Sequence, residues 1–432
     1  MTSGLPFIAA FVIARQPSHH VLVILARRIT DKSLRSVTAK DCCAYSVMGD
    51  DHVAVLASCP FEPLRHDTGF YVCLAVRYGR VITDTEFQLA ELVQATRNHG
   101  MPLEALRYDV TPTGLHYLLI HYDIPAMDLD TLRLEIGGLV GNPRSVTLAD
   151  LHERETVERE VVMECAGNGR ATMSPRPLSQ PWGLEAVGCG RWAGTPLAPL
   201  LEEAGVDPTA VEVVFTGADQ GIEDGQQQTY ARSLSVADAT ADDVLLAHTL
   251  NGQPLPPQHG APVRLLVPGW YGMTSVKWLR QIAVVDTPFT GYQQTQAYRF
   301  ATDPDDPGTP LNRIAVRSLM IPPGIPDFPH RTRTLQAGEC SLEGRAWSGA
   351  GPIDRVEVST DAGESWHDAQ IRRPPDPRAW THWTTRWDAT PGAHVLMSRA
   401  TDTSGQTQPE QSTWNRGGYR ANGWQHVPVT VV

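Results

Sequence analysis

Residues 161–170 read VVMECAGNGR, and this stretch decides how the rest of the chain is interpreted. A run of apolar residues typical of a buried strand passes into Cys165 and then into a turn that contains Gly167 and Gly169. Glycine lets a backbone approach a bulky ligand closely, and a nearby arginine such as Arg170 lowers the pKa of a thiol. Two interpretations of Cys165 therefore stand side by side: a small buried residue at a strand end, or a thiolate that binds a metal.

The surroundings of Cys165 in the sequence limit the kind of metal site that it could form. No partner cysteine or histidine lies at the spacing of a zinc site. A lone thiolate binds a metal only if something else supplies the remaining ligands, and an organic cofactor that carries its own sulfurs meets this condition. Spacing alone favours the packed, structural interpretation of a single buried cysteine. We interpret Cys189, in the segment VGCGRW, as structural.

Length and composition exclude several classes of protein. At 432 residues the chain is too long for one ordinary core, so two or three domains are expected. Hydrophobic residues make up 41% and charged residues 19%, which is typical of a globular protein. The formal net charge of −12 provides no positive field for nucleic acid or an anionic membrane. An anionic substrate would have to be attracted by a few arginines in a pocket.

The cysteine spacing and the apolar runs near the start of the chain indicate in which cellular compartment the protein is expected. Seven scattered cysteines, with no C-x-x-C or C-x-x-C-H pair, predict reduced thiols and no c-type haem. The apolar runs at 5–14 and 21–26 are far shorter than the roughly 20 residues that span a bilayer. We therefore expect a cytoplasmic protein. Residues 1–85 are either a small accessory segment or an extension from an over-early start codon.

The pattern changes twice along the chain. Residues 86–300 alternate short β-rich runs with turns and short helices, which predicts one mixed α+β domain. Its expected strands include 132–136, 212–215 and 263–267, and its expected helices are 148–152, with Thr147 as the capping residue, and 196–204. Residues 301–432 begin with proline-rich connectors at 303–310 and 322–329 and then alternate apolar and polar residues at short spacing, which predicts an antiparallel β-sandwich. Its expected strands are 340–347, 354–360, 365–371, 381–388 and 394–401.

Basic residues in the α+β domain suggest anion sites. Arg264 and Lys277 flank a strand and a Pro-Gly turn, and His259 lies just upstream. Arginine contacts two oxygens at once and lysine acts as a point charge, so the three are a candidate phosphate clamp. Arg97 and Arg170 then remain for a different anion. The alternative for each of these residues is a surface ion pair or a core hydrogen bond.

Several blocks, in this order and spacing, resemble the sulfite oxidase family of molybdopterin-dependent oxidoreductases. They are RNHG (97–100), ECAGNGR (164–170), GRWAG (190–194), LNGQPLPPQHGAPVRLLVPGWYG (250–272) and VKWL (276–279). The tail blocks GRAWSGAGPIDRVEVSTDAGESW (344–366) and WNRGG (414–418) resemble that family's C-terminal dimerisation domain. The resemblance runs from about residue 95 to the C-terminus.

The resemblance implies both a fold and a site. The fold is α+β: a sulfite-oxidase-type mixed α/β molybdopterin-binding domain at 86–300, then an immunoglobulin-like β-sandwich dimerisation domain at 301–432. Cys165 ligates molybdenum, Tyr298 is the active-site tyrosine, and Arg97 and Arg170 face the substrate. The implied cofactor contacts are Arg97, Asn98, His99, Asp219, His259, Arg264, Ser275, Val276 and Lys277.

Two positions depart from the family pattern. Members with established sulfite activity carry two consecutive arginines after CAGN, whereas this chain has Gly169 before Arg170. Another anion-binding arginine is expected where this chain has Gly417. Arg416 and Arg420 are the candidate replacements.

The resemblance implies oxidation of sulfite to sulfate by oxo transfer, in a homodimer that passes electrons to an external cytochrome, another carrier or oxygen. No haem is expected in this chain, and neither nucleic acid nor membrane is an expected partner. The main alternative is another oxo-transfer substrate, nitrate or a sulfoxide, on the same cofactor. A non-enzymatic adhesion module and a zinc or thiol hydrolase are the remaining alternatives, although no histidine pairs with Cys165 in a recognised hydrolase block.

Overall fold

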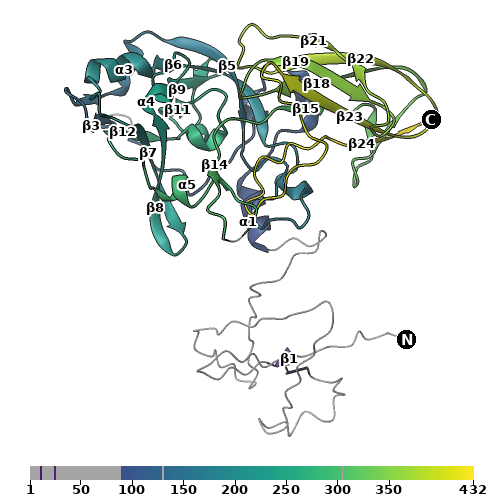
Figure 1. Ribbon diagram of the computed structural model, residues 1–432, viewed down its shortest axis with the longest axis horizontal. Coiled ribbons are helices and arrows are strands. Elements are labelled where there is room, and N and C mark those ends of the chain that lie inside the picture. The colour runs from purple at the N-terminus through teal and green to yellow at the C-terminus, as the bar shows by residue number, and fades with distance from the viewer. Residues whose placement is uncertain (1–9, 12–23, 26–88, 129–130, 304) are drawn as a thin grey trace. The chain divides into compact units, whose positions relative to one another are not determined.

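The computed structural model describes residues 10–11, 24–25, 89–128, 131–303 and 305–432 (Figure 1). The chain divides into two compact units, Met1–Thr85 and Glu86–Val432. In the first unit, β1 (Ala10–Phe11) pairs antiparallel with β2 (Ile24–Leu25). The two interpretations of residues 1–85 otherwise fall outside the described residues. Among the helices that the structure describes, none is long and apolar enough to cross a membrane.

The α+β region of the second unit contains two five-stranded sheets. One has the order β10-β9-β6-β5, with β11 also pairing with β9, and the other has the order β4-β3-β12-β7-β8. All pairs are antiparallel except β3 with β12. The strands are β3 (Leu134–Gly138), β4 (Arg144–Val146), β5 (Val157–Glu164), β6 (Val187–Pro196), β7 (Glu212–Glu223), β8 (Gln226–Ser235), β9 (Leu245–Leu250), β10 (Gln253–Pro254), β11 (Arg264–Leu266) and β12 (Leu279–Val285).

Short helices connect these strands, and their ends follow from local chemistry. Thr147 caps α2: its hydroxyl accepts from Asp150 N, and the Asp150 carboxylate accepts from Thr147 N. In α3, the buried Leu197, Leu200 and Leu201 contribute to the main hydrophobic core of this region. The helices are α1 (Leu89–Arg97), α2 (Leu148–His152), α3 (Leu197–Ala204), α4 (Val236–Ala239) and α5 (Tyr292–Thr295), with 3-10 turns at Leu103–Arg107, Thr113–Leu115, Arg170–Thr172, Pro257–His259 and Gly272–Thr274.

The C-terminal part is the predicted β-sandwich. Its sheets have the orders β15-β18-β22-β21 and β16-β17-β24-β23-β19-β20, in which only β17 and β24 are parallel. In β24 the valines alternate with exposed residues and enter the core between the sheets. The strands are β15 (Arg317–Met320), β16 (Ile325–Pro326), β17 (Arg333–Leu335), β18 (Gly338–Trp347), β19 (Ile353–Ser359), β20 (His367–Asp368), β21 (Gln370–Arg372), β22 (Thr381–Ala389), β23 (Gly392–Asp402) and β24 (Val427–Val431), after a connector hairpin of β13 (Arg299–Phe300) and β14 (Thr309–Pro310).

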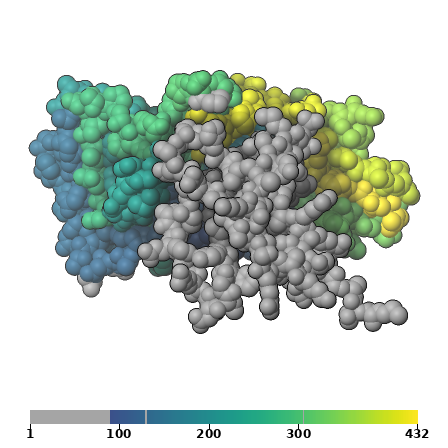
Figure 2. Space-filling model, turned by 90° about the horizontal axis from the view of Figure 1, so that it is seen from below, coloured from purple at the N-terminus to yellow at the C-terminus, as the bar shows by residue number. Residues whose placement is uncertain are grey.

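The sandwich and the α+β region share a hydrophobic core. Met101 and Tyr271 of the α+β region belong to the same buried cluster as Trp347 and Trp380 of the sandwich. The C-terminal segment also returns to the connector, where the N–H of Arg416 donates to Ala301 O over 2.8 Å. In Figure 2 this late segment, in yellow, adjoins green segments from the middle of the chain. The two regions therefore pack as one body around the turn after β5.

Candidate active site

Cys165 follows the last residue of β5 and is buried, with 7% of its surface exposed. Its backbone N–H donates to Ala186 O over 2.9 Å, and its carbonyl accepts from the N–H of Asn168 over 3.0 Å. The Asn168 amide in turn donates to the Glu164 carboxylate over 2.9 Å, which closes the turn. Burial raises the pKa of the Cys165 thiol, and the Arg170 charge offsets part of this rise.

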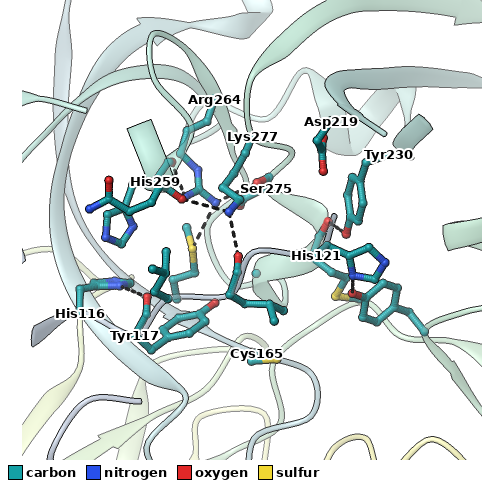
Figure 3. A pocket seen from close by; sticks show the side chains of 17 residues that line it. His116, Tyr117, His121, Cys165, Asp219, Tyr230, His259, Arg264, Ser275 and Lys277 are labelled. Carbon is teal, nitrogen blue, oxygen red and sulfur yellow. Dashed lines mark hydrogen bonds between the residues drawn. The ribbon is translucent and has the colours of Figure 1, made fainter. Parts of the chain in front are cut away.

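A first pocket, here called the cofactor pocket, has Cys165 at one edge (Figure 3). Arg264, Lys277 and His259 gather on one side of it. Asp219 and Tyr230 lie on another side. The full lining is His116, Tyr117, Leu118, Leu119, His121, Met163, Cys165, Asp219, Tyr230, Gln258, His259, Arg264, Gly272, Met273, Ser275, Lys277 and Tyr298.

Arg264 and Lys277 are held in place by backbone carbonyls. The Arg264 guanidinium donates to His259 O over 3.0 Å and to Ser275 O over 2.8 Å. The Lys277 ammonium donates to Leu119 O over 2.8 Å and to Gln258 O over 3.1 Å. Neither cation forms an ion pair with any residue that the structure describes. Such fixed positive charges are complementary to a phosphate group.

Burial and mutual repulsion make protonation costly in this part of the pocket. Burial, together with the Arg264 charge, lowers the pKa of Lys277 to about 7. Burial lowers the pKa of Arg264 to about 10. Burial also lowers the pKa of His259 to about 2 and that of His116 to about 4, so both imidazoles are neutral. An anion bound here would stabilise the charged forms of Lys277 and Arg264.

The rest of the cofactor pocket presents polar atoms suited to a heterocycle. Among the described residues, Asp219 Oδ1, His116 Nε2 and Thr274 Oγ1 are buried without a hydrogen-bond partner. Burial raises the pKa of Asp219 to about 6. Buried polar atoms normally have partners, so these three mark positions where a ligand would complete the hydrogen bonding. A phosphorylated pterin, with ring N–H groups and a phosphate, fits this set of donors and acceptors.

A second pocket, here called the substrate pocket, shares Leu119, His121, Cys165 and Tyr298 with the first. Arg170 is buried in its wall, where the guanidinium donates to Gly417 O over 2.8 Å and to Gln180 O over 3.1 Å. The full lining is Gln94, Arg97, Asn98, Leu119, Ile120, His121, Tyr122, Cys165, Gly167, Arg170, Ser179, Gln180, Trp182, Ile222, Glu223, Ala297, Tyr298 and Tyr419. The sulfur-bearing residue thus lies where a cofactor pocket and a charged substrate pocket meet.

Tyr298 is held in an unfavourable backbone conformation between the two pockets. Its φ of 51° is rare for a residue with a side chain and indicates that the surroundings impose it. Its hydroxyl lies 3.4 Å from His121 Nδ1. Burial raises the pKa of Tyr298, so the hydroxyl stays protonated and can donate a hydrogen bond.

Most of the residues predicted from the sequence lie at these two pockets. Asp219, His259, Arg264, Ser275 and Lys277 line the cofactor pocket together with Cys165. Arg97, Asn98 and Arg170 line the substrate pocket, and Tyr298 lines both.

The block RNHG is placed differently from its expected role as a cofactor contact. Arg97 and Asn98 line the substrate pocket, where the Arg97 guanidinium donates to Tyr122 O over 2.6 Å. His99 lines neither pocket, and its N–H donates to Leu118 O over 3.2 Å. Val276 also lines neither pocket, because its side chain belongs to the hydrophobic core. The role of all four as cofactor contacts stays a prediction.

His116, Tyr117 and His121 line the cofactor pocket but were not predicted from the sequence. They belong to the segment GLHYLLIHYD, where two histidines flank a short apolar run. Two histidines around an apolar run could have indicated that this segment lines a site. This signal is weak, because a histidine beside apolar residues is usually a core residue.

The structure explains both departures from the family pattern. Gly169 has φ of 90°, and a Cβ there would lie 2.5 Å from Ala421 O, so a larger residue does not fit. A Cβ on Gly417 would lie 2.2 Å from the ring of Tyr419. Tyr419 packs against Arg170, 5.2 Å from ring centroid to guanidinium carbon. Neither Arg416 nor Arg420 lines the cofactor pocket or the substrate pocket, whereas Tyr419, two residues after Gly417, lines the substrate pocket.

Comparison with protein families identifies both parts of the second unit. Residues 121–293 match the oxidoreductase molybdopterin binding domain, and residues 312–432 match the Mo-co oxidoreductase dimerisation domain. The first match begins at His121, after the block RNHG. The chain therefore contains a molybdopterin-binding domain, and its pocket has the donors and acceptors that such a cofactor needs.

Comparison with individual proteins gives the same result. Mitochondrial sulfite oxidase of Rattus norvegicus is 33% identical over 347 residues, covering 75% of this chain and 62% of that protein. The mouse enzyme (Mus musculus) is 33% identical over 446 residues, covering 99% of this chain and 75% of its own. A nitrate reductase [NAD(P)H] of Hordeum vulgare is also 33% identical, covering 74% of this chain and 39% of its own.

A solved structure extends the likeness to the fold. The sulfane dehydrogenase SoxCD from Paracoccus pantotrophus aligns with a TM-score of 0.66 and 29% identity, covering 76% of this chain and 82% of that one. These matches exclude the hydrolase and adhesion-module alternatives. This chain belongs to the sulfite oxidase family of molybdopterin-dependent oxidoreductases.

Proposed function

We propose that this protein oxidises sulfite to sulfate at a molybdenum centre and passes the electrons to an external acceptor. The observation that carries the proposal is the position of Cys165, whose side chain borders both the cofactor pocket and the substrate pocket. In the overall reaction sulfite and water give sulfate, two protons and two electrons. When bound, the molybdenum cofactor supplies the oxo-transfer chemistry and accepts the electron pair.

The residues of the cofactor pocket have distinct roles in this proposal. Cys165 would be the protein ligand to molybdenum, because a thiolate suits a soft metal and metal binding favours its deprotonated form. Arg264 and Lys277 would bind the phosphate of the pterin. Asp219, with its unpaired carboxylate oxygen, would accept hydrogen bonds from pterin N–H groups. His116 is neutral, so its unpaired Nε2 can either accept or donate.

The residues of the substrate pocket orient the anion. Arg97 and Arg170 draw the substrate by charge, and the carbonyls of Gly417 and Gln180 hold the Arg170 guanidinium in one place. Because these carbonyls use two of its nitrogens, Arg170 acts mainly through its field. The Tyr298 hydroxyl would form a hydrogen bond with the reacting oxygen, as donor or as acceptor. The aromatic rings of Tyr298 and Tyr419, 5.5 Å apart, limit the space beside them.

We also propose the wider assembly. The domains are taken as 86–300 for cofactor binding and 301–432 for dimerisation, and the chain forms a two-fold homodimer, in keeping with the match to a dimerisation domain. Light scattering should give twice the chain mass of 47.3 kDa at micromolar concentration, and a monomer would contradict the dimer. The acceptor is a cytochrome, another carrier or oxygen. We also propose a cytoplasmic location. The free thiols of Cys165, Cys189 and Cys340 support it, because thiols stay reduced in that compartment.

The decisive test is a steady-state assay of the molybdenum-loaded protein with sulfite and ferricyanide. Turnover that saturates with sulfite is expected. Absence of turnover at millimolar sulfite, in protein with stoichiometric molybdenum, would contradict the substrate assignment and leave the cofactor assignment standing.

Nitrate is the second candidate substrate, with a sulfoxide in third place. It is favoured by the 33% identity to a nitrate reductase and by the lining of the substrate pocket, which includes Tyr419 but neither Arg416 nor Arg420 and so offers less positive charge to a dianion. The same loaded protein, assayed with nitrate and a reduced viologen dye, separates the two. Faster turnover with nitrate than with sulfite would make nitrate the substrate.

A further inference from the structure

A hydrogen-bonded chain of side chains leads from Tyr298 to Glu223. The Tyr298 hydroxyl lies 3.4 Å from His121 Nδ1, and His121 Nε2 lies 3.1 Å from Glu223 Oε2. The three residues lie on segments far apart in the sequence, and His121 borders both pockets. The contact between Tyr298 and His121 is the longer of the two, and such hydrogen bonds commonly shorten when a ligand fills the site.

The two contacts of His121 assign its tautomer. An ionised carboxylate accepts hydrogen bonds and donates none, so Nε2 must carry a proton toward Glu223. Nδ1 is then unprotonated in the neutral ring and points its lone pair at the Tyr298 hydroxyl. This arrangement resembles the general case in which a carboxylate orients a histidine that acts as a base on a hydroxyl group.

Glu223 is fixed by neighbours that keep it ionised. Tyr122 donates its hydroxyl to Glu223 Oε2 over 2.8 Å, and the Gln293 amide lies 3.3 Å from the same oxygen. Burial alone would raise the pKa of Glu223, but the hydrogen bonds from His121, Tyr122 and Gln293 outweigh it and lower the pKa below its usual range. A carboxylate held in this state stabilises a positive charge on His121.

The other groups around His121 are aromatic or lie further away. The ring of Tyr230, from β8, is edge-on at 5.4 Å between centroids, and the ring of Tyr122 is edge-on at 4.5 Å. The charge of His121 also acts on Asp219 of β7, where it offsets part of the rise in the Asp219 pKa. About 23% of the His121 side chain is exposed, so solvent reaches the imidazole. By contrast, only 7% of Tyr298 is exposed.

We propose that His121 is the proton acceptor of this site, reached through Tyr298 and positioned by Glu223. The Tyr298 hydroxyl takes a proton from the water consumed in the reaction as it passes its own proton to His121, so an Nδ1–H bond forms while the tyrosine stays protonated. The resulting imidazolium is paired with Glu223 and then releases its Nδ1 proton to solvent, which restores the starting tautomer. One passage removes one of the two protons released per sulfite, while the electrons leave to the external acceptor.

This inference rests on the proposed oxidation, and its kinetic test uses the full, molybdenum-loaded chain with sulfite and ferricyanide. His121→Gln should lower kcat by roughly a hundredfold and leave KM for sulfite within about threefold, since a general base contributes to turnover and not to binding. Glu223→Gln should also lower kcat, by roughly tenfold, because the imidazolium formed on His121 loses the carboxylate that stabilises it. Asp224→Asn is the matched control, since it removes a charge one residue away and its φ of 51° suits asparagine.

A second measurement does not depend on turnover. Nitrogen NMR of histidine-labelled protein, with the His121 signal assigned from the His121→Gln spectrum, should show the Nε2–H tautomer in the neutral ring. The preference for the Nε2–H tautomer should be lost in Glu223→Gln, because an amide can donate as well as accept, and should be kept in Asp224→Asn.

The outcomes separate the two proposals. If the parent protein does not oxidise sulfite, the proposed function fails, while the NMR result still tests the His121–Glu223 pair. An Nδ1–H tautomer overturns the inference. So does a kcat of His121→Gln within twofold of the parent at equal molybdenum content, or an equal change in kcat in Glu223→Gln and Asp224→Asn.

Discussion

Glu164 and Arg317 form a buried ion pair, with 3.0 Å between the Glu164 Oε1 and Arg317 Nε atoms and 1% of each side chain exposed. Glu164 ends β5 and precedes Cys165, whereas Arg317 begins β15 of the sandwich. Trp347 of the sandwich donates its indole N–H to the other carboxylate oxygen over 2.8 Å. The C-terminal region, which matches a dimerisation domain, therefore also holds the turn that contains Cys165 in place.

Breaking this ion pair should destabilise the whole protein. Glu164→Gln leaves the Arg317 charge buried without its counterion, which costs about 3–5 kcal/mol. Urea unfolding should show this loss, and molybdenum content should fall with it. Glu160→Gln is the control, because its pair with Arg191 lies near the surface and contributes no more than about 1 kcal/mol. Equal stability losses in the two variants would contradict the role of Glu164.

Removing the sulfur should abolish activity while the fold survives. Cys165→Ser replaces a soft thiolate by a hard hydroxyl of similar size, so the metal loses its protein ligand. We expect no measurable turnover, reduced molybdenum by elemental analysis and an unchanged circular dichroism spectrum. Cys340→Ser, a partly exposed position in the sandwich, should keep full activity. Full activity in Cys165→Ser would refute the ligand assignment.

Anion binding to the cofactor-free pocket should weaken as the pH rises through about 7. Lys277, with a pKa of about 7, is charged below this value and neutral above it. Because an anion binds the charged form, affinity is highest at pH 6 and lower at pH 8.5, where Arg264, with a pKa of about 10, is still charged. Sulfate is a suitable probe, since it remains a dianion over this range. Calorimetry should show weaker binding at pH 8.5.

Two variants separate the contributions to this site. Lys277→Met should bind sulfate weakly at both pH values and lose the pH dependence. Arg264→Met should bind sulfate weakly but keep the pH dependence, because Lys277 is still present. A parent protein with equal sulfate affinity at pH 6 and pH 8.5 would show that Lys277 does not contact the anion.

An arginine introduced at position 417 should fit only when the Tyr419 side chain is removed. Gly417→Arg alone should lower stability by roughly 1–3 kcal/mol, because its Cβ would meet the Tyr419 ring, which is packed between Arg170 and Tyr298. Adding Tyr419→Gly should recover part of this loss and lower KM for sulfite. Additive effects in the double-mutant cycle would contradict the steric relationship.

Local sequence patterns were sufficient for much of the fold. The alternation of apolar and polar residues predicted the sandwich, and the structure has strands at β18, β19, β22 and β23. Thr147 and Asp150 form the predicted helix cap. These features depend on residues a few positions apart, so their physical cause lies within a short segment.

The sequence by itself determined the family, the α+β and sandwich architecture, and the chemical types at Cys165, Arg264 and Lys277. Only the tertiary structure decided what surrounds them. It joined His121 to Glu223 across 102 positions and Glu164 to Trp347 across 183, and it placed Tyr419 against Arg170. Such contacts depend on how distant strands pack, and no local period or spacing encodes that packing. For the same reason RNHG, although similar to a family block, lies outside the cofactor pocket that the segment around His121 lines.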